Sequence, residues 1–151
     1  MKLKIKRTIQ IVIFILMSNQ SYGQMIMSAE GISPKNVCKQ NTIYFLISDR
    51  AKPNESIDSI EIRLNRLINF VKENPSFESK PSIQFAVNCK GEIGGGFHMV
   101  TESGNDELDK ELIEFFENII SWKPGKIKNK AVDSWFMWRM EIKNGHIVLL
   151  N

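Results

Sequence analysis

The stretch SIQFAVNCKGEIGGGFHMVT, residues 82–101, predicts a β-hairpin. Ile83, Phe85 and Val87 recur at every second position, which is the period of a strand with one buried face. Residues 88–91 have the composition of a tight turn, so residues 92–101 are expected to return as the second strand. The glycines at positions 94–96 interrupt this return, and they predict either a bulge or the close approach of a neighbouring element.

An amphipathic helix is predicted on each side of the hairpin. The first begins after Ser56, the expected N-cap, and ends before Asn74-Pro75. Its apolar residues recur at three- and four-residue steps: Ile57, Ile60, Leu64, Leu67, Ile68 and Val71. The second follows residues 103–105, and its apolar stripe consists of Leu108, Leu112, Phe115, Phe116 and Ile119. Its acidic residues fall mostly off this stripe, and the early ones favour a helix N-terminus. They therefore indicate a solvated face rather than paired catalytic carboxylates.

Further strands are predicted at residues 42–47 and 132–143, where β-branched and aromatic residues gather. Asn144-Gly145 is the dipeptide that a type I′ turn favours, so residues 146–150 should fold back as a final strand. The lysines between residues 123 and 130 indicate a flexible, solvated basic loop. Together these elements predict an α+β fold, with a small antiparallel sheet and two helices packed on one of its faces.

The two faces of the strand at residues 132–143 differ in their expected surroundings. Phe136 and Trp138 share the face that fits a core covered by the helices. Trp135 and Met137 share the opposite face. There they either form a patch that binds a partner or lie beneath the N-terminal segment, because large apolar patches are seldom left exposed on monomers.

The first 23 residues have the pattern of a secretory signal peptide. Four basic residues precede an apolar run at residues 9–17, and Ser21 and Gly23 provide the small residues of a cleavage site. We expect cleavage after Gly23 and an exported protein, located in the periplasm if the source is a Gram-negative bacterium. The chain then divides into a signal peptide (1–23), an N-terminal extension with one strand (24–55) and a single domain (56–151).

Composition and charge exclude several classes of protein. With 42% apolar and 25% charged residues, the chain is neither disordered, collagen-like nor a multi-spanning membrane protein. Its formal charge of +3 comes from the leader, because residues 24–151 carry 16 basic and 17 acidic side chains. Nucleic acid is therefore not an expected partner.

Cys38 and Cys89 are the two cysteines of the chain. In an oxidising compartment they could form a disulfide that adds about 3–4 kcal/mol to stability, and otherwise they remain two ordinary thiols. No Cys-x-x-Cys pair is present, and His98 and His146 are the only histidines. Neither a structural metal site nor a cofactor-binding loop is expected.

Three stretches carry a resemblance to a known family: residues 83–93, residues 100–109 and Trp122-Lys123-Pro124-Gly125. In order and spacing they resemble the C-terminal domain of TonB-type energy transducers, over about residues 80–143. The resemblance implies a small antiparallel sheet with helices on one face. The five prolines are scattered, so the chain has no Pro-rich spacer and looks like a stand-alone exported relative without a membrane anchor.

In that family the domain is a non-catalytic binding module, which adds an extended peptide from an outer-membrane transporter to an exposed sheet edge. The resemblance implies a receiving strand at residues 132–142, although the Asn144-Gly145 hairpin would place the final strand on the same edge. The expected partner-binding residues are Val132, Ser134, Trp135, Phe136, Met137 and Trp138. The alternative is an exported structural or self-associating domain, in which residues 132–143 pair across a homodimer.

Overall fold

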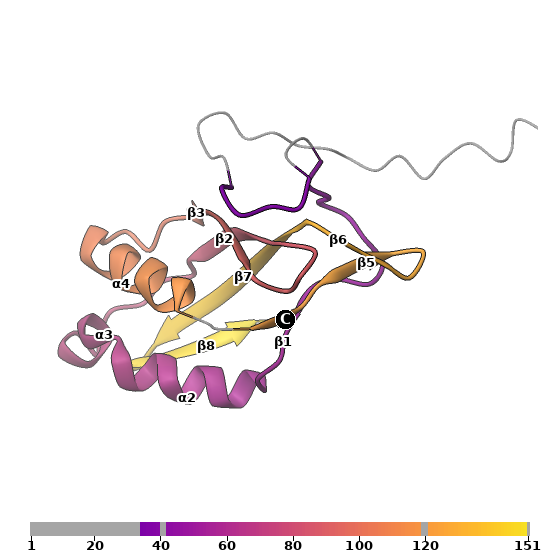
Figure 1. The fold of residues 1–151 in the computed structure, drawn as a ribbon. Helices are drawn as coiled ribbons and strands as arrows, with labels where there is room; N and C mark the ends of the chain where they lie inside the picture. Colours follow the sequence, from indigo (N-terminus) through magenta and orange to yellow (C-terminus); the bar gives the residue numbers. More distant parts are fainter. Residues whose placement is uncertain (1–33, 40–41, 119–120, 151) are drawn as a thin grey trace, which may run out of the picture.

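The computed structural model of the chain describes residues 34–39, 42–118 and 121–150, and its architecture is α+β (Figure 1). The main sheet has four antiparallel strands in the order β3-β2-β7-β8. These are β2 (Ser82–Val87), β3 (Ile93–Thr101), β7 (Ser134–Lys143) and β8 (His146–Leu150). None of the described helices is long and apolar enough to cross a membrane. The predicted signal peptide lies outside the described residues.

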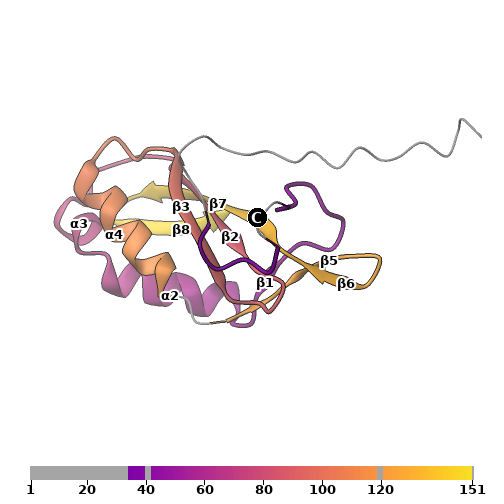
Figure 2. The ribbon, with the colours of Figure 1, turned by 45° about the horizontal axis from the view of Figure 1, so that its top comes forward.

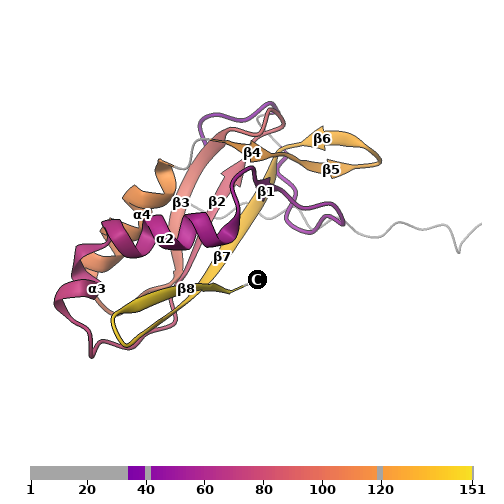
Figure 3. The same ribbon diagram turned by 90° about the horizontal axis from the view of Figure 1, so that it is seen from below.

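The helices α2 (Ile57–Leu67) and α4 (Asp106–Glu117) cover one face of this sheet (Figures 2 and 3). Ser56 caps α2 as predicted, because its hydroxyl accepts a hydrogen bond from the N–H of Ser59. The side chain of Asn105 caps α4 by accepting a hydrogen bond from the N–H of Leu108. The core lies between the two layers and includes Ile60, Leu64, Ile83, Phe85, Leu108, Leu112, Phe116, Trp138, Met140, Ile142 and Ile147.

The hairpin of β2 and β3 forms as predicted, and both explanations of its glycines hold. The register between the two strands shifts on each side of Ala86, so the hairpin is bulged. A neighbouring segment also comes close: a Cβ at Gly96, whose φ is 71°, would lie 3.0 Å from the Trp135 ring and 3.1 Å from Pro34. Side chains are excluded here because the chain before β1 (Lys52–Pro53) runs over the glycines.

The single helix predicted over residues 57–71 is interrupted in the structure. Ile68 has an extended backbone (φ −72°, ψ 112°), and it ends α2 and begins α3 (Asn69–Glu73). The N–H of Phe70, in the first turn of α3, donates to the carboxylate of Glu111 in α4 at 3.1 Å. This tertiary contact ties α3 to α4 and supports a change of direction that the apolar periodicity did not reveal.

Two other predictions are wrong. Within residues 42–47 only Tyr44 pairs, in one parallel bridge to Ser134. The lysine-rich segment is not a flexible loop but a hairpin of β5 (Gly125–Ile127) and β6 (Lys130–Val132), preceded by β4 (Trp122–Lys123), which pairs with β1. Lys128 and Asn129 adopt positive φ angles of 49° and 64°, as a type I′ turn requires. The strand predicted over residues 132–143 is consequently divided between β6 and β7.

Side chains of α2 cover the outer edge of β8. Asn65 accepts from the N–H of Ile147 and donates to its C=O, both at 2.8 Å. Glu61 accepts from the N–H of Leu149 at 2.6 Å. An open strand edge offers its backbone groups to other chains. The contacts from α2 occupy these groups and close this edge of the sheet.

We expect Asn65→Ala to lower the free energy of unfolding by about 2–3 kcal/mol, because two backbone groups of Ile147 lose their partner. The exposed neighbour Arg66 provides a control, since Arg66→Ala should change stability by no more than about 0.5 kcal/mol. Urea denaturation measures both values. Equal stabilities of the two variants would show that the contact with β8 is not needed.

Candidate binding site

The predicted partner-binding residues lie at different depths along β6 and β7. Phe136 and Trp138 point into the helix-covered side, where the ring centroids of Trp122 and Phe136 are 4.7 Å apart and those of Phe136 and Trp138 are 5.3 Å apart. Ser134 is fully buried, and Val132, in β6, is partly exposed. In this arrangement Ser134 and Trp138 are not accessible to another protein.

Trp135 lies on the opposite face of the sheet, beneath the N-terminal segment, by which we mean the described residues before β1 (34–39 and 42–51). Only 9% of its surface is exposed, and its ring and that of Pro34 both border Gly96. Of the two surroundings considered for Trp135, cover by the same chain is the one found. Met137, two residues further along the same face, remains partly exposed.

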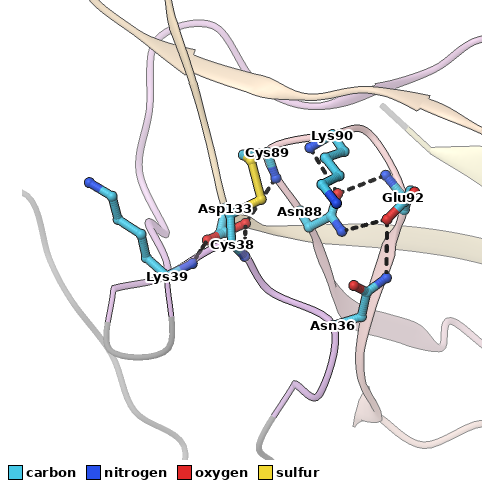
Figure 4. Close-up of a disulfide and its surroundings, with 8 residues drawn as sticks. All are labelled: Asn36, Cys38, Lys39, Asn88, Cys89, Lys90, Glu92 and Asp133. Carbon is cyan, nitrogen blue, oxygen red and sulfur yellow. Dashed lines mark hydrogen bonds between the residues drawn. A yellow bond between two sulfur atoms is a disulfide. The ribbon is translucent and has the colours of Figure 1, made fainter.

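A disulfide between Cys38 and Cys89 fastens the N-terminal segment to the turn between β2 and β3, with 6.0 Å between the two Cα atoms (Figure 4). The carboxylate of Asp133 lies beside it. One of its oxygens accepts from the N–H groups of Cys38 (3.0 Å) and Cys89 (2.8 Å), and the other accepts from the N–H of Lys39 (2.8 Å). Asp133 is 3% exposed, so these three bonds satisfy a buried charge.

The turn between β2 and β3 is held by its own side chains (Figure 4). Asn88 accepts from the N–H groups of Lys90 (2.9 Å) and Glu92 (3.0 Å). The carboxylate of Glu92 accepts from the side-chain amides of Asn88 (3.0 Å) and Asn36 (3.3 Å). The hydrogen bond from Asn88, with the one from Asn36, lowers the pKa of Glu92 from its usual value. The turn and the N-terminal segment are thus joined by polar contacts as well as by the disulfide.

Tyr44 extends the contact of the N-terminal segment to the first residues of β7. Its N–H donates to the C=O of Asp133 at 3.0 Å, and its C=O accepts from the N–H of Trp135 at 2.8 Å. At the other end of β7, residues 139–143 pair with β8. On the side away from β2, the middle of β7 therefore lies between Tyr44 and the end of β8.

The backbone of Met137 faces the space between Tyr44 and the end of β8, which we call the gap. Met140 donates its N–H to the C=O of Pro81, on the β2 side of β7. Backbone groups alternate in direction along a strand, so those of Met137, three residues earlier, point away from β2. Among the described residues, no backbone group is hydrogen-bonded to Met137 on that side.

The gap is the floor of a groove of about 420 Å³. Its lining combines apolar side chains with two arginines: Phe45, Leu46, Arg50, Trp135, Phe136, Met137, Arg139 and Leu150. Leu46 and Leu150 are 53% and 39% exposed on its two sides. We call this feature the β7 groove. Three of the predicted partner-binding residues line it, together with residues that sequence reasoning did not identify.

Comparisons with protein-family models, with curated proteins and with solved structures find no match to the chain. The resemblance to the TonB C-terminal domain therefore stays a prediction. The α+β architecture rests on the structure alone. The site has to be interpreted from its geometry.

We expect Asp133→Asn to lower the free energy of unfolding by about 2–4 kcal/mol, because an uncharged amide accepts more weakly and directs N–H groups toward backbone donors. Glu141→Gln, which removes a partly exposed carboxylate from the neighbouring strand β7, should cost less than about 1 kcal/mol. Urea denaturation at neutral pH measures both. A loss for Asp133→Asn no larger than that for the control would contradict the proposed role of its carboxylate.

The double variant Cys38→Ser/Cys89→Ser should unfold with a free energy about 3–4 kcal/mol lower, since the disulfide closes a loop between residues 51 positions apart. Hydrogen exchange should also rise at Tyr44 and Trp135, because the N-terminal segment loses its covalent attachment. The reduced wild-type chain serves as the comparison. Unchanged stability in both reduced and substituted protein would show that the disulfide adds nothing to the contacts of Asp133.

Proposed function

We propose that this chain is a non-catalytic binding module, which captures an extended segment of an envelope or outer-membrane transport protein in the β7 groove. The observation that carries this proposal is the orientation of Met137, whose N–H and C=O face the groove. An extended peptide that lies beside β7 would bond to these groups as an added strand. Main-chain bonding of this kind supplies affinity without requiring a catalytic residue.

The walls of the β7 groove indicate the kind of segment that it would accept. Leu46 and Leu150 offer exposed apolar surface on the two sides, while Arg50 and Arg139 bring two positive charges. An apolar side chain flanked by a carboxylate would match both features, since arginine binds carboxylates with paired hydrogen bonds. We infer that the partner segment is extended, short and partly acidic.

The location and the transport role rest on the sequence. The signal-peptide pattern of residues 1–23 favours export, and the resemblance to TonB-type domains favours an outer-membrane transporter as partner. The alternative is a structural or self-associating domain that pairs along residues 132–143. It has less support, because β2 lies along one side of β7 and β8 along part of the other.

Met137→Pro tests the groove directly, because proline removes the N–H that faces the gap while the bonds between β7 and β2 are retained. We expect the purified wild-type chain to retain a transporter from solubilised envelope, and Met137→Pro to lose at least about 90% of it. In the wild-type complex, hydrogen exchange of the Met137 amide should slow by about tenfold or more.

Lys143→Ala provides the control. Proline is not used at this position, because the N–H of Lys143 takes part in the pairing of β7 with β8. The alanine variant changes an exposed residue of the same strand outside the groove and should bind normally. Circular dichroism confirms that each variant is folded. Equal capture by Met137→Pro and wild type, with both folded, would refute binding in the β7 groove.

A further inference from the structure

We propose that the outer edge of β3 is a second docking site, which takes an extended segment of another protein that carries lysine or arginine side chains. β3 is an edge strand of the main sheet, with a strand neighbour, β2, on one side only (Figure 1). This surface lies at the opposite edge of the sheet from β8, and it is separate from the β7 groove.

The beginning of β3 is covered, whereas its second half is open. Asn36 donates its backbone N–H to the C=O of Gly94 at 3.1 Å and its side-chain amide to the C=O of Ile93 at 3.2 Å. From residue 97 to residue 101, no described residue forms a backbone hydrogen bond on the outer side. Five residues of open edge provide room for a short added strand.

Met99 is the centre of this open edge. It lies opposite Ile83, and the backbone groups of Ile83 point toward β7, as the C=O of Pro81 does. Met99 and Ile83 are therefore a pair without mutual hydrogen bonds, and the N–H and C=O of Met99 point outward. Val100, beside it, is 49% exposed. The register shift between Ser82 and Ile83 adds one residue, Val100, between Met99 and Thr101.

β3 is bulged against β2, but it lacks the charged residues and prolines that often keep an edge strand from pairing. Its sequence, IGGGFHMVT, contains no lysine, no acidic residue and no proline. Edge strands are commonly protected by such residues, or by cover from another element. β8 has cover from Asn65 and Glu61 of α2, but within the described part of the chain the second half of β3 has none.

The surface beside this edge determines which kind of segment would dock. A groove of about 600 Å³ extends from β3 to α4. Its lining contains four carboxylates, one ammonium group, one imidazole and two apolar side chains: Glu102, Asp106, Asp109, Glu114, Lys110, His98, Met99 and Ile113. Lys110 lies 3.8 Å from Glu114, and Asp109 accepts from the N–H of Ser103, so the groove retains an excess of negative charge.

This charge favours a cationic segment over a second copy of the chain. Antiparallel pairing of two β3 strands would place the acidic wall of one α4 next to that of the other, and like charges repel. A segment with alternate lysine or arginine side chains would instead place them toward the carboxylates, while its backbone pairs with Met99. Charge complementarity therefore selects the basic extended segment.

Two labelled heptapeptides test the proposal: Thr-Lys-Val-Lys-Val-Lys-Thr and its counterpart with glutamate in place of lysine, both blocked at their ends. Fluorescence anisotropy with the full chain should show the basic peptide binding at least about tenfold more tightly. Its affinity should fall as salt is raised, because exposed charges are screened. The amide of Met99 should show slower hydrogen exchange in the complex.

Two variants separate the backbone from the charges. Met99→Pro should weaken the basic peptide about tenfold or more, because proline removes the outward N–H of an edge strand. Glu102→Gln/Glu114→Gln should weaken it about five- to tenfold and reduce the salt dependence. Glu107→Gln/Glu117→Gln makes the same charge change on exposed residues outside the groove and should bind normally, as should Met137→Pro.

Three results would overturn the proposal. The first is equal binding, or no binding, of the basic and acidic peptides at millimolar concentration. The second is normal binding by folded Glu102→Gln/Glu114→Gln, whose exposed substitutions leave the core intact. The third is a dimer, detected by light scattering and abolished by Met99→Pro, which would make a second copy the occupant of β3.

Discussion

The buried carboxylate of Asp133 connects three parts of the chain that are far apart in sequence. It accepts hydrogen bonds from Cys38 and Lys39 in the N-terminal segment and from Cys89 in the turn between β2 and β3, while its own backbone leads into β7. A buried charge is tolerated only when its hydrogen bonds are complete, so these segments have to keep their positions together. The disulfide adds a covalent constraint between two of them.

The contacts of Asp133 and the disulfide determine the shape of the surface on the face of the sheet away from α2 and α4. Once the segment near Cys38 is fixed, Tyr44 bonds to Asp133 and Trp135, and Phe45 and Leu46 become one wall of the β7 groove. The groove is thus formed by a segment with little regular structure, held at one end by a carboxylate and a disulfide. Its geometry depends on contacts that lie outside the groove itself.

The elements that could be predicted are those with signals close together in sequence. The alternation at 83–87, the Ser56 cap and the Asn144-Gly145 turn each act within a few residues, and the strand, the cap and the turn are all present. The prediction of a single buried face at 83–87 is wrong, because Ala86 on the opposite face is fully buried as well. The partners of Asp133 are 44 to 95 residues away and are backbone N–H groups, which leave no mark in a sequence. The break at Ile68 likewise accompanies a contact between Phe70 and Glu111, which belongs to another helix.

The candidate site could be predicted only in part for the same reason. Trp135 and Met137 were correctly placed on the face away from the helices, because strand periodicity fixes the face of each residue. Periodicity does not show what covers a face, so the cover of Trp135 by the N-terminal segment required the structure. The walls contributed by Phe45, Leu46 and Arg50 come from a stretch without periodicity.

The short length of β7 that Tyr44 and β8 leave uncovered has a further consequence for binding. The open stretch of β7 is short, since Tyr44 and β8 limit it at both ends, and few main-chain bonds can form there. Selectivity must then come mainly from the walls, and one wall is attached through the Cys38–Cys89 disulfide. Disulfides persist in oxidising compartments and are rare where thiols are kept reduced. A groove built in this way keeps its full shape under the conditions that an exported protein meets, which links the architecture of the site to the location that the leader sequence predicts.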